Sequence, residues 1–475
     1  MIKKGDLITV EVTSLNSEGK GISKTDEGFV IFSEKTLPGD TAQIRIKKKK
    51  SNYAEAVLVE LIKPSDFRID AKCSHFGVCG GCKIQNYSYD KQLDFKTIVV
   101  QDALQRIGGF DIPKILSALG SAEVFYYRNK MEYSFSDDEW LDAKDIDIEK
   151  DNYALGLHVP GFHSKIINIE NCFLQSELSN KILNFTYNFF KEKKVSVYST
   201  KTQSGMLRFL IIRQSKNTND LMINLITFEH DEDLMTEYTA GLKHLFPEIT
   251  TIINSTTQKK AQVAFGENEY ILHGEGFITE ILKDCTGKEF SFKISPQSFF
   301  QTNTLQAENL FRVMTEFGKF GKDDNVLDLY CGTGSVSIIL SESVNKVKGV
   351  ELIQDSINDA KINSDLNSIT NCEYICSDIK DFLENPESIS GYNKLVLDPP
   401  RSGLHPKICE ILSETEFEKI VYVSCNPHTQ ARDLKMICSR DKYKIDKIQP
   451  VDMFPHTYHI ENIVSLVRKN ISQDA

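Results

Sequence analysis

The spacing of hydrophobic and polar positions divides the chain into regions with different predicted structure. Over residues 5–62, short β-rich or alternating segments are separated by turn residues, which predicts a small β-barrel. Residues 88–108 follow a helical pattern that ends at Gly108 and Gly109. From Ile294 onward, apolar strands alternate with helices, as in a doubly wound α/β sheet.

The predicted fold class is therefore α/β, with a Rossmann-like C-terminal domain, an N-terminal OB-like β-barrel and a central α+β domain. We expect the helix over residues 88–108 to pack on the C-terminal domain, although it precedes the central strands. The predicted domains are residues 1–63, 64–293 and 294–475.

Composition is ordinary for a soluble globular protein, with 40% hydrophobic and 26% charged residues. No stretch reaches the apolar length of a membrane span, and the N-terminus leads into no apolar signal core. We therefore expect a cytoplasmic protein with no membrane contact. The net charge of −11 argues against nucleic-acid binding over the whole surface.

The predicted barrel is the exception in charge, because residues 1–63 carry a net charge of +2. The run Lys47–Lys50 supplies much of this excess and is a candidate RNA contact, with a solvated loop as the alternative. In its turns at residues 19–21 and 37–40, the segment resembles a TRAM domain, an OB-like barrel used for RNA binding. A small barrel without an RNA contact remains the alternative.

Three of the eleven cysteines are grouped with ligand-like spacing. Cys73, Cys79 and Cys82 form a C-x5-C-x2-C pattern, and the glycines at 80 and 81 let the backbone wrap closely around a bound centre. Three thiolates this close together would repel one another without a cation, so we expect a metal. Cys172 is the best candidate for the fourth ligand. Zinc and an iron–sulfur cluster both accept four cysteines.

Chemically useful side chains end five successive predicted strands of the C-terminal domain. Residues 325–335 give an apolar strand, a glycine turn and the start of a helix. Glu351, Asp378, Asp398 and Cys425 end the next four strands. Ligands bind at this edge of open α/β sheets, where Glu351 can accept hydrogen bonds from ribose hydroxyls and Asp378 can meet an adenine amine. This layout is typical of an S-adenosylmethionine-dependent methyltransferase.

Five motifs together resemble the RNA uracil-C5 methyltransferase family. They are residues 299–301, 328–334, 398–404, 424–427 and 454–461. With the barrel and the cysteines, the resemblance covers nearly the whole chain and favours the branch that methylates 23S ribosomal RNA. Members of that branch carry a four-cysteine [4Fe–4S] cluster, which implies that Cys73, Cys79, Cys82 and Cys172 are its ligands.

The same resemblance implies roles for individual residues. Cys425 matches the family's nucleophile and Glu461 matches its base. The matching S-adenosylmethionine contacts are Gln301, Tyr330, Glu351 and Asp398, and Asp378 and Ser335 are further candidates. Ser335 stands where family members often have asparagine. The implied partner is RNA, as a loop of unassembled or partly assembled 23S ribosomal RNA, and no obligate protein partner is evident.

Several alternatives stay open at this stage. A tRNA uracil-C5 enzyme uses the same chemistry, and an RNA cytosine-C5 enzyme carries a cysteine directly after Asp-Pro-Pro, where this chain has Arg401. A non-catalytic iron–sulfur RNA-binding protein belongs to a different class, although the combination of Cys425, Glu461 and the cofactor acids argues against it. Taken alone, without the family resemblance, Glu461 is better explained as a carboxylate at the start of a strand.

Overall fold

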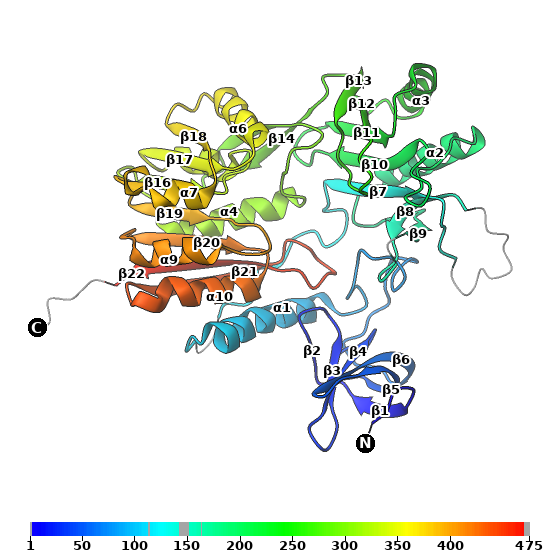
Figure 1. Ribbon diagram of the computed structural model, residues 1–475, viewed down its shortest axis with the longest axis horizontal. Helices are drawn as coiled ribbons and strands as arrows, with labels where there is room; N and C mark the ends of the chain where they lie inside the picture. The colour runs from blue at the N-terminus through cyan, green and yellow to red at the C-terminus, as the bar shows by residue number, and fades with distance from the viewer. Residues whose placement is uncertain (1, 113–114, 142–151, 163, 470–475) are drawn as a thin grey trace, which may run out of the picture.

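The computed structural model describes residues 2–112, 115–141, 152–162 and 164–469. Figure 1 shows the N-terminal barrel below, the C-terminal α/β domain to the left and the central sheet to the right. In the described residues the strands form a six-stranded sheet, two seven-stranded sheets and a two-stranded sheet. No helix in these ranges is long and apolar enough to cross a membrane.

The first sheet has the strand order β1-β5-β6-β4-β3-β2 and forms the predicted barrel. Alternation places Ile31, Ile44 and Ala54 in its core, while the lysines of the 47–50 run are exposed. The barrel strands are β1 Leu7–Glu11, β2 Ser14–Leu15, β3 Gly21–Lys24, β4 Val30–Glu34, β5 Thr41–Lys49 and β6 Tyr53–Lys63.

The central sheet has the order β13-β12-β11-β10-β7-β8-β9, with β13 and β9 at its edges. Its middle strands β10 and β11 are almost wholly buried. The elements are β7 Lys130–Ser136, β8 Ala154–His158, β9 Ile166–Asn168, α2 Glu177–Glu192, β10 Leu207–Gln214, β11 Leu221–Thr227, α3 Glu232–Leu245, β12 Thr251–Thr256 and β13 Asn268–His273. The hairpin of β14 Ile278–Lys283 and β15 Glu289–Ile294 leads into the C-terminal domain.

The C-terminal sheet has the order β18-β17-β16-β19-β20-β22-β21. The predicted parallel sheet is confirmed for β16 to β20, whereas β22 runs antiparallel between β20 and β21. The strands are β16 Asn325–Leu329, β17 Lys346–Glu351, β18 Cys372–Cys376, β19 Lys394–Leu397, β20 Lys419–Ser424, β21 Tyr443–Val451 and β22 Glu461–Arg468. The helices are α4 Thr304–Gly318, α5 Ser335–Ser341, α6 Gln354–Leu366, α7 Ile379–Glu384, α8 Pro386–Ile389, α9 Pro406–Glu414 and α10 Pro427–Ile437.

Helix α1 (Tyr89–Ala103) comes from the N-terminal part of the chain but packs on the C-terminal domain. It continues as a π-helical turn, Leu104–Gly108, and ends at Gly109 with a left-handed φ of 73°. Val100 and Leu104 join the same hydrophobic core as residues of α9, α10 and β22. The predicted boundaries at residues 63 and 293 stay a prediction.

A buried ion pair joins α1 to the connection between β21 and β22. Lys96 Nζ lies 2.5 Å from Asp452 Oδ1, and both side chains are fully buried. Lys96 also donates to the carbonyl oxygen of Phe454, and the Tyr89 hydroxyl donates to Asp452 Oδ2 at 3.0 Å. The loop over residues 452–460 is therefore fixed by a helix that lies more than 350 residues earlier in the chain.

Replacing Lys96 by Met should lower the free energy of unfolding by about 3–5 kcal/mol, because the Asp452 carboxylate would remain buried without its counter-charge. Urea denaturation measures the change. Lys91→Met on the same helix is the matched control, since its ion pair with Asp94 is partly exposed and should contribute less than about 1 kcal/mol. Equal effects of the two variants would contradict the importance of the buried pair.

Candidate active site

Cys425 and Glu461 lie side by side at one edge of the C-terminal sheet. Cys425 directly follows β20, and the turn into α10 is set by Asn426, whose side chain caps the helix, and by Pro427. Strand β22 pairs with β20 so that Asn462 opposes Ser424, and Glu461 precedes Asn462 by one residue. The thiol and the carboxyl therefore come from hydrogen-bonded neighbouring strands.

Two buried amide side chains hold these strands in register. Gln430 on α10 donates to the carbonyl oxygens of Tyr422 at 2.9 Å and of Asn462 at 3.1 Å. The Asn462 amide donates in return to Gln430 Oε1 at 2.7 Å. No short sequence motif indicates this pair, because it forms only when α10 packs over both strands.

The acids around Cys425 disfavour one another's ionisation. Burial, and then the charges of Glu461 and Asp398, raise the pKa of the Cys425 thiol to about 11, while Arg401 acts in the opposite direction. Burial and Asp398 raise the pKa of Glu461 to about 8. Burial and the charge of Asp328 raise the pKa of Asp398 to about 7. The site thus contains two carboxyls that can exchange protons near neutral pH and a thiol that stays protonated there.

The loop after β16 is shaped to admit a ligand close to the backbone. Tyr330 has a left-handed φ of 67°, and its backbone N–H donates to the carbonyl oxygen of Val350 at 2.9 Å. Gly332 has a φ of 53°, and a β-carbon there would meet open space. Asp328 is buried; its Oδ2 accepts a hydrogen bond from the Ser337 hydroxyl at 2.7 Å, and its Oδ1 has no protein partner among the described residues.

The candidate cofactor acids occupy the neighbouring strand ends. Glu351 accepts hydrogen bonds from the N–H groups of Leu352 at 2.8 Å and Ile353 at 3.0 Å, and the Gly332 N–H approaches its second oxygen at 3.3 Å. Asp378 caps α7 through one oxygen and is exposed. Leu352 and Ile353 are 57% and 54% exposed, so this edge pairs carboxylates with apolar surface. That combination fits the ribose and adenine of S-adenosylmethionine.

Gln301 and Ser335 lie near the N-terminal ends of two helices, α4 and α5. Gln301 lies just before α4, and its carbonyl oxygen accepts a hydrogen bond from the Asn129 side chain at 2.9 Å. Ser335 is the first residue of α5 and is half-buried. Asn303 caps α4 and donates to the carbonyl oxygen of Met453, so the Gln301 segment is joined to the loop that precedes Glu461.

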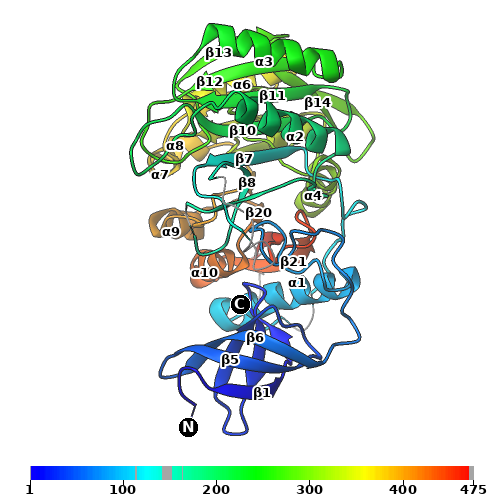
Figure 2. The ribbon, with the colours of Figure 1, turned by 90° about the vertical axis from the view of Figure 1, so that its right-hand side faces the viewer.

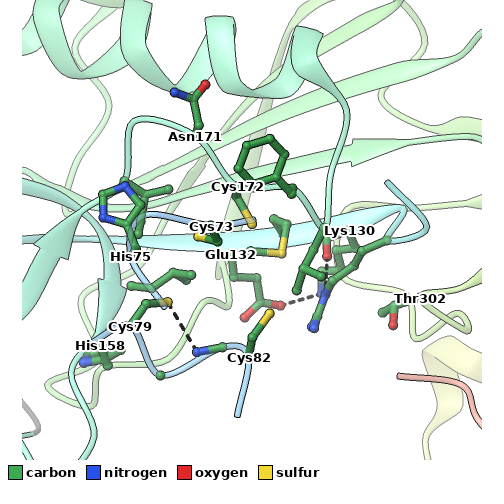
Figure 3. Close-up of a pocket in the computed structure, with 18 of the residues that line it drawn as sticks. Cys73, His75, Cys79, Cys82, Lys130, Glu132, His158, Asn171, Cys172 and Thr302 are labelled. Carbon is green, nitrogen blue, oxygen red and sulfur yellow. Dashed lines mark hydrogen bonds and ion pairs between the residues drawn. The ribbon is translucent and has the colours of Figure 1, made fainter. Parts of the chain in front are cut away.

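The four predicted metal-binding cysteines line one cavity of about 550 Å³ in the central region. Figure 3 shows Cys73, Cys79, Cys82 and Cys172 around this space, with Lys130 and Glu132 on its other side. Burial, and then the charges of the other cysteines, raise the pKa of Cys82 to about 12. Within the described ranges, no three His, Cys, Asp or Glu side chains are arranged to hold a metal ion, so the predicted metal site is not confirmed.

The sulfur atoms in this cavity have local hydrogen-bond donors. The Gly81 N–H lies 3.3 Å from Cys79 Sγ, and the Gln85 side chain donates to Cys82 Sγ at 3.5 Å while accepting from the Cys73 N–H at 2.8 Å. A β-carbon on Gly80 would come within 2.6 Å of the His158 carbonyl oxygen. The glycine and the glutamine therefore allow this loop to hold its thiols toward the cavity.

Cationic side chains from three segments act on the imidazole of His459, two residues before Glu461. Burial, Arg401, Lys96, Arg128 and Lys83 together lower the pKa of His459 to about 4. Apart from Lys96, these cations form no ion pair within the described part of the chain. The alternation of aromatic and cationic residues over 126–130 indicates Arg128 as a candidate phosphate contact, whereas no sequence pattern indicates Lys83.

Comparisons with known proteins agree on the family. A family model described as tRNA (Uracil-5-)-methyltransferase matches residues 215–469, and a TRAM domain model matches residues 3–59. An uncharacterized RNA methyltransferase of Chlorobaculum tepidum is 38% identical, and the match covers 98% of this chain and 97% of that protein. One of Bacteroides thetaiotaomicron is 39% identical over 95% of this chain and 99% of its own length.

A solved structure is also similar over almost its whole length. The tRNA (uracil-54, C5)-methyltransferase of Pyrococcus abyssi, crystallised with S-adenosyl-L-homocysteine, superposes with a TM-score of 0.75. It is 30% identical, and the match covers 97% of this chain and all of that chain. The predicted TRAM domain is thus confirmed, and the protein belongs to the tRNA (uracil-5-)-methyltransferase family of S-adenosylmethionine-dependent RNA methyltransferases.

Proposed function

We propose that this protein transfers a methyl group from S-adenosylmethionine to carbon 5 of uridine in RNA, with Cys425 as nucleophile and Glu461 as base. The observation that carries the proposal is the position of the two side chains on adjacent, paired strands. Both lie at the edge of the sheet that also presents Glu351 and the loop after β16. The thiol, the carboxyl and the cofactor acids can therefore act on one bound nucleotide.

The proposed methyl transfer gives a role to the thiol, to the cofactor and to the carboxyl. Carbon 5 of uracil is a poor nucleophile, but addition of the Cys425 thiolate to carbon 6 makes an enolate with electron density at carbon 5. S-adenosylmethionine, when bound, supplies an electrophilic methyl group to that carbon. The Glu461 carboxylate then removes the proton from carbon 5, and the bond between sulfur and carbon 6 breaks to release the thiolate and 5-methyluridine.

The loop that begins at Asp398 is tied to the turn that contains Cys425. The segment Asp398-Pro399-Pro400 is rigid and follows β19, next to the Cys425 turn. The Asn426 side chain donates to the carbonyl oxygen of Arg401 at 3.1 Å, which ties the two loops together. We propose that this loop forms a wall against the target base and that Gln301, Tyr330, Glu351, Asp378, Asp398 and Ser335 contact S-adenosylmethionine.

For the RNA substrate, we propose 23S ribosomal RNA, in a loop where the uridine can leave its stack. The four cysteines that line one cavity support this branch of the family. Lys83, Arg128 and Arg401, which have no ion-pair partner among the described residues, suit a polyanionic substrate in a chain whose net charge is −11. The second candidate is tRNA, because the similar Pyrococcus abyssi structure is of a tRNA (uracil-54, C5)-methyltransferase.

We further propose that Cys73, Cys79, Cys82 and Cys172 bind a [4Fe–4S] cluster. All four thiols face one cavity of about 550 Å³, which is roomy for a single ion with sulfur ligands at ~2.3 Å. The N–H donors to Cys79 and Cys82 suit sulfur atoms that carry negative charge. The backbone N–H groups of Lys83 and Ile84 donate to the carbonyl oxygen of His456 at 2.8 and 3.0 Å, so a cluster here would brace the loop before Glu461.

Replacing Cys425 by Ala should abolish methyl transfer from tritiated S-adenosylmethionine while leaving cofactor affinity unchanged, because the thiol is needed only for addition to uracil. Cys285→Ala is the matched control, since this cysteine is exposed and lies outside the site. Transcripts of 23S ribosomal RNA and of tRNA serve as separate substrates. Undiminished transfer by Cys425→Ala would exclude the thiol mechanism, and methylation of tRNA alone would replace the proposed substrate by the second candidate.

Replacing Glu461 by Gln should block proton removal and trap a methylated covalent adduct between Cys425 and the RNA, visible on a denaturing gel. In the wild-type enzyme, kcat/KM should rise with pH through about 8, because the Glu461 carboxyl is protonated below that pKa and cannot act as a base. In the Gln variant, the rate of adduct formation should still rise with pH, because addition needs the Cys425 thiolate, but it should show no inflection near pH 8. Rapid turnover without an adduct in this variant would show that another group removes the proton.

Protein purified without oxygen should be brown and contain about four iron atoms and four sulfides per chain, as expected for a [4Fe–4S] cluster. Cys79→Ser should lose most of the iron, whereas Cys285→Ser should retain it. Elemental analysis and visible absorbance measure both. A colourless protein loaded with one zinc ion would contradict the cluster.

A further inference from the structure

One exposed loop of the central region is held by a fully buried arginine. The loop comprises residues 257–266, between β12 and β13, and we call it the Arg208 loop. Arg208 is 1% exposed and donates to the carbonyl oxygens of Thr257 at 2.9 Å, Lys259 at 2.7 Å and Ala261 at 2.7 Å. Its guanidinium lies 4.1 Å from the centre of the Tyr198 ring.

Arg208 forms no ion pair with a carboxylate of the described residues. Burying a guanidinium without a counter-charge is unfavourable, so its hydrogen bonds to the loop must offset much of that cost. The hydrogen bonds from Arg208 therefore fix the conformation of a loop whose outer face is exposed to solvent.

The outer face of the Arg208 loop combines cations with an aromatic ring. Lys259 and Lys260 are exposed and form no ion pair within the ranges that the structure describes. Phe265 is 45% exposed, and the Lys259 ammonium lies 4.8 Å from the centre of its ring. Val263 is 42% exposed, whereas Ala264 points inward and packs against a small buried cluster.

The two glutamates that follow the loop are exposed, but both are hydrogen-bonded within the protein. Glu267 accepts hydrogen bonds from the Thr257 hydroxyl and the Gln258 N–H, both at 2.9 Å, and the charge of Lys259 also acts on it. Glu269 accepts one from the Gln297 side chain at 2.9 Å. These contacts help to shape the loop, and neither lysine forms an ion pair with either glutamate within 4 Å.

The Arg208 loop is joined to the segment that enters the cofactor site. The Gln297 side chain donates to the carbonyl oxygen of Gly266 at 2.8 Å. Gln301 follows Gln297 by four residues, so their α-carbons are at most ~14 Å apart. Phe299, between them, is 70% exposed. A nucleic acid strand bound at the active site can therefore reach this loop within a few nucleotides.

We propose that the Arg208 loop binds a single-stranded segment of the substrate RNA beside the target uridine. Lys259 and Lys260 contact backbone phosphates, and Phe265 stacks on an unpaired base. This inference rests on the proposed function and adds a second RNA-binding surface to it. In both ribbon views, β12 and β13 lie at the end of the molecule opposite the TRAM barrel (Figures 1 and 2). The RNA is thus held on two sides of the catalytic domain.

The test measures the Kd of the methylated RNA substrate over a series of salt concentrations. The double variant Lys259→Ala, Lys260→Ala should weaken binding about tenfold. Its slope of log Kd against log salt should fall by about 1.4, because each of the two lysines that no longer neutralises a single-strand phosphate lowers the slope by ~0.7. Phe265→Ala should weaken binding by about tenfold with an unchanged slope, because stacking releases no counterions. Affinity for S-adenosylhomocysteine should not change in either variant.

Lys193→Ala, Lys194→Ala is the matched control, because it removes two adjacent exposed lysines at the end of α2 in the same region. If the loop variants bind RNA with the Kd and salt slope of this control, the Arg208 loop does not bind RNA. If Phe265→Ala instead abolishes self-association seen by sedimentation, the loop binds a second copy and the proposal fails. RNA binding by the wild-type protein without methyl transfer would overturn the proposed function while leaving the loop's role intact.

Discussion

The position of the Glu461 carboxyl, the proposed base, depends on the buried ion pair between Lys96 and Asp452. Asp452 opens the loop that ends at Glu461, and a charged lysine from α1 holds it in the protein interior. Gln92 adds a second connection, since its side chain accepts from the His456 N–H at 2.9 Å. The N-terminal helix, the cysteine loop and the Gln301 segment all bond to this one connection between β21 and β22. Residues far from the chemistry therefore decide where the base lies.

Burial has opposite consequences for stability and chemistry at the active site. Removing Cys425, Glu461 and Asp398 from water raises the pKa of each, so their protonated forms predominate more than they would on the surface. A protonated thiol is a poor nucleophile but also resists oxidation. Arg401 is the nearby charge that favours the thiolate.

Much of the fold could be predicted because its signals are local. Alternation located the barrel strands, and apolar runs ending in Glu351, Asp398 and Cys425 located the parallel sheet and one shared edge. The position of the antiparallel strand β22 in the sheet could not be predicted, because no residue pattern indicates that it inserts between β20 and β21. Likewise, no local pattern indicates that Lys96 meets Asp452 or that Gln430 meets Asn462. Such pairs depend on tertiary packing, which also decides whether the distant Cys172 shares a cavity with Cys73, Cys79 and Cys82.

The strand order divides this edge of the sheet into a locally built part and a part built from distant segments. Strands β16 to β19 pair through local βα units; Glu351 ends β17, and Asp398 directly follows β19. The β21–β22 hairpin instead supplies the antiparallel neighbour of β20, and its loop is clamped by a helix from the distant N-terminal region. The position of Glu461 therefore depends on sequence far outside the α/β repeat, whereas the positions of Glu351 and Asp398 depend on short-range connections.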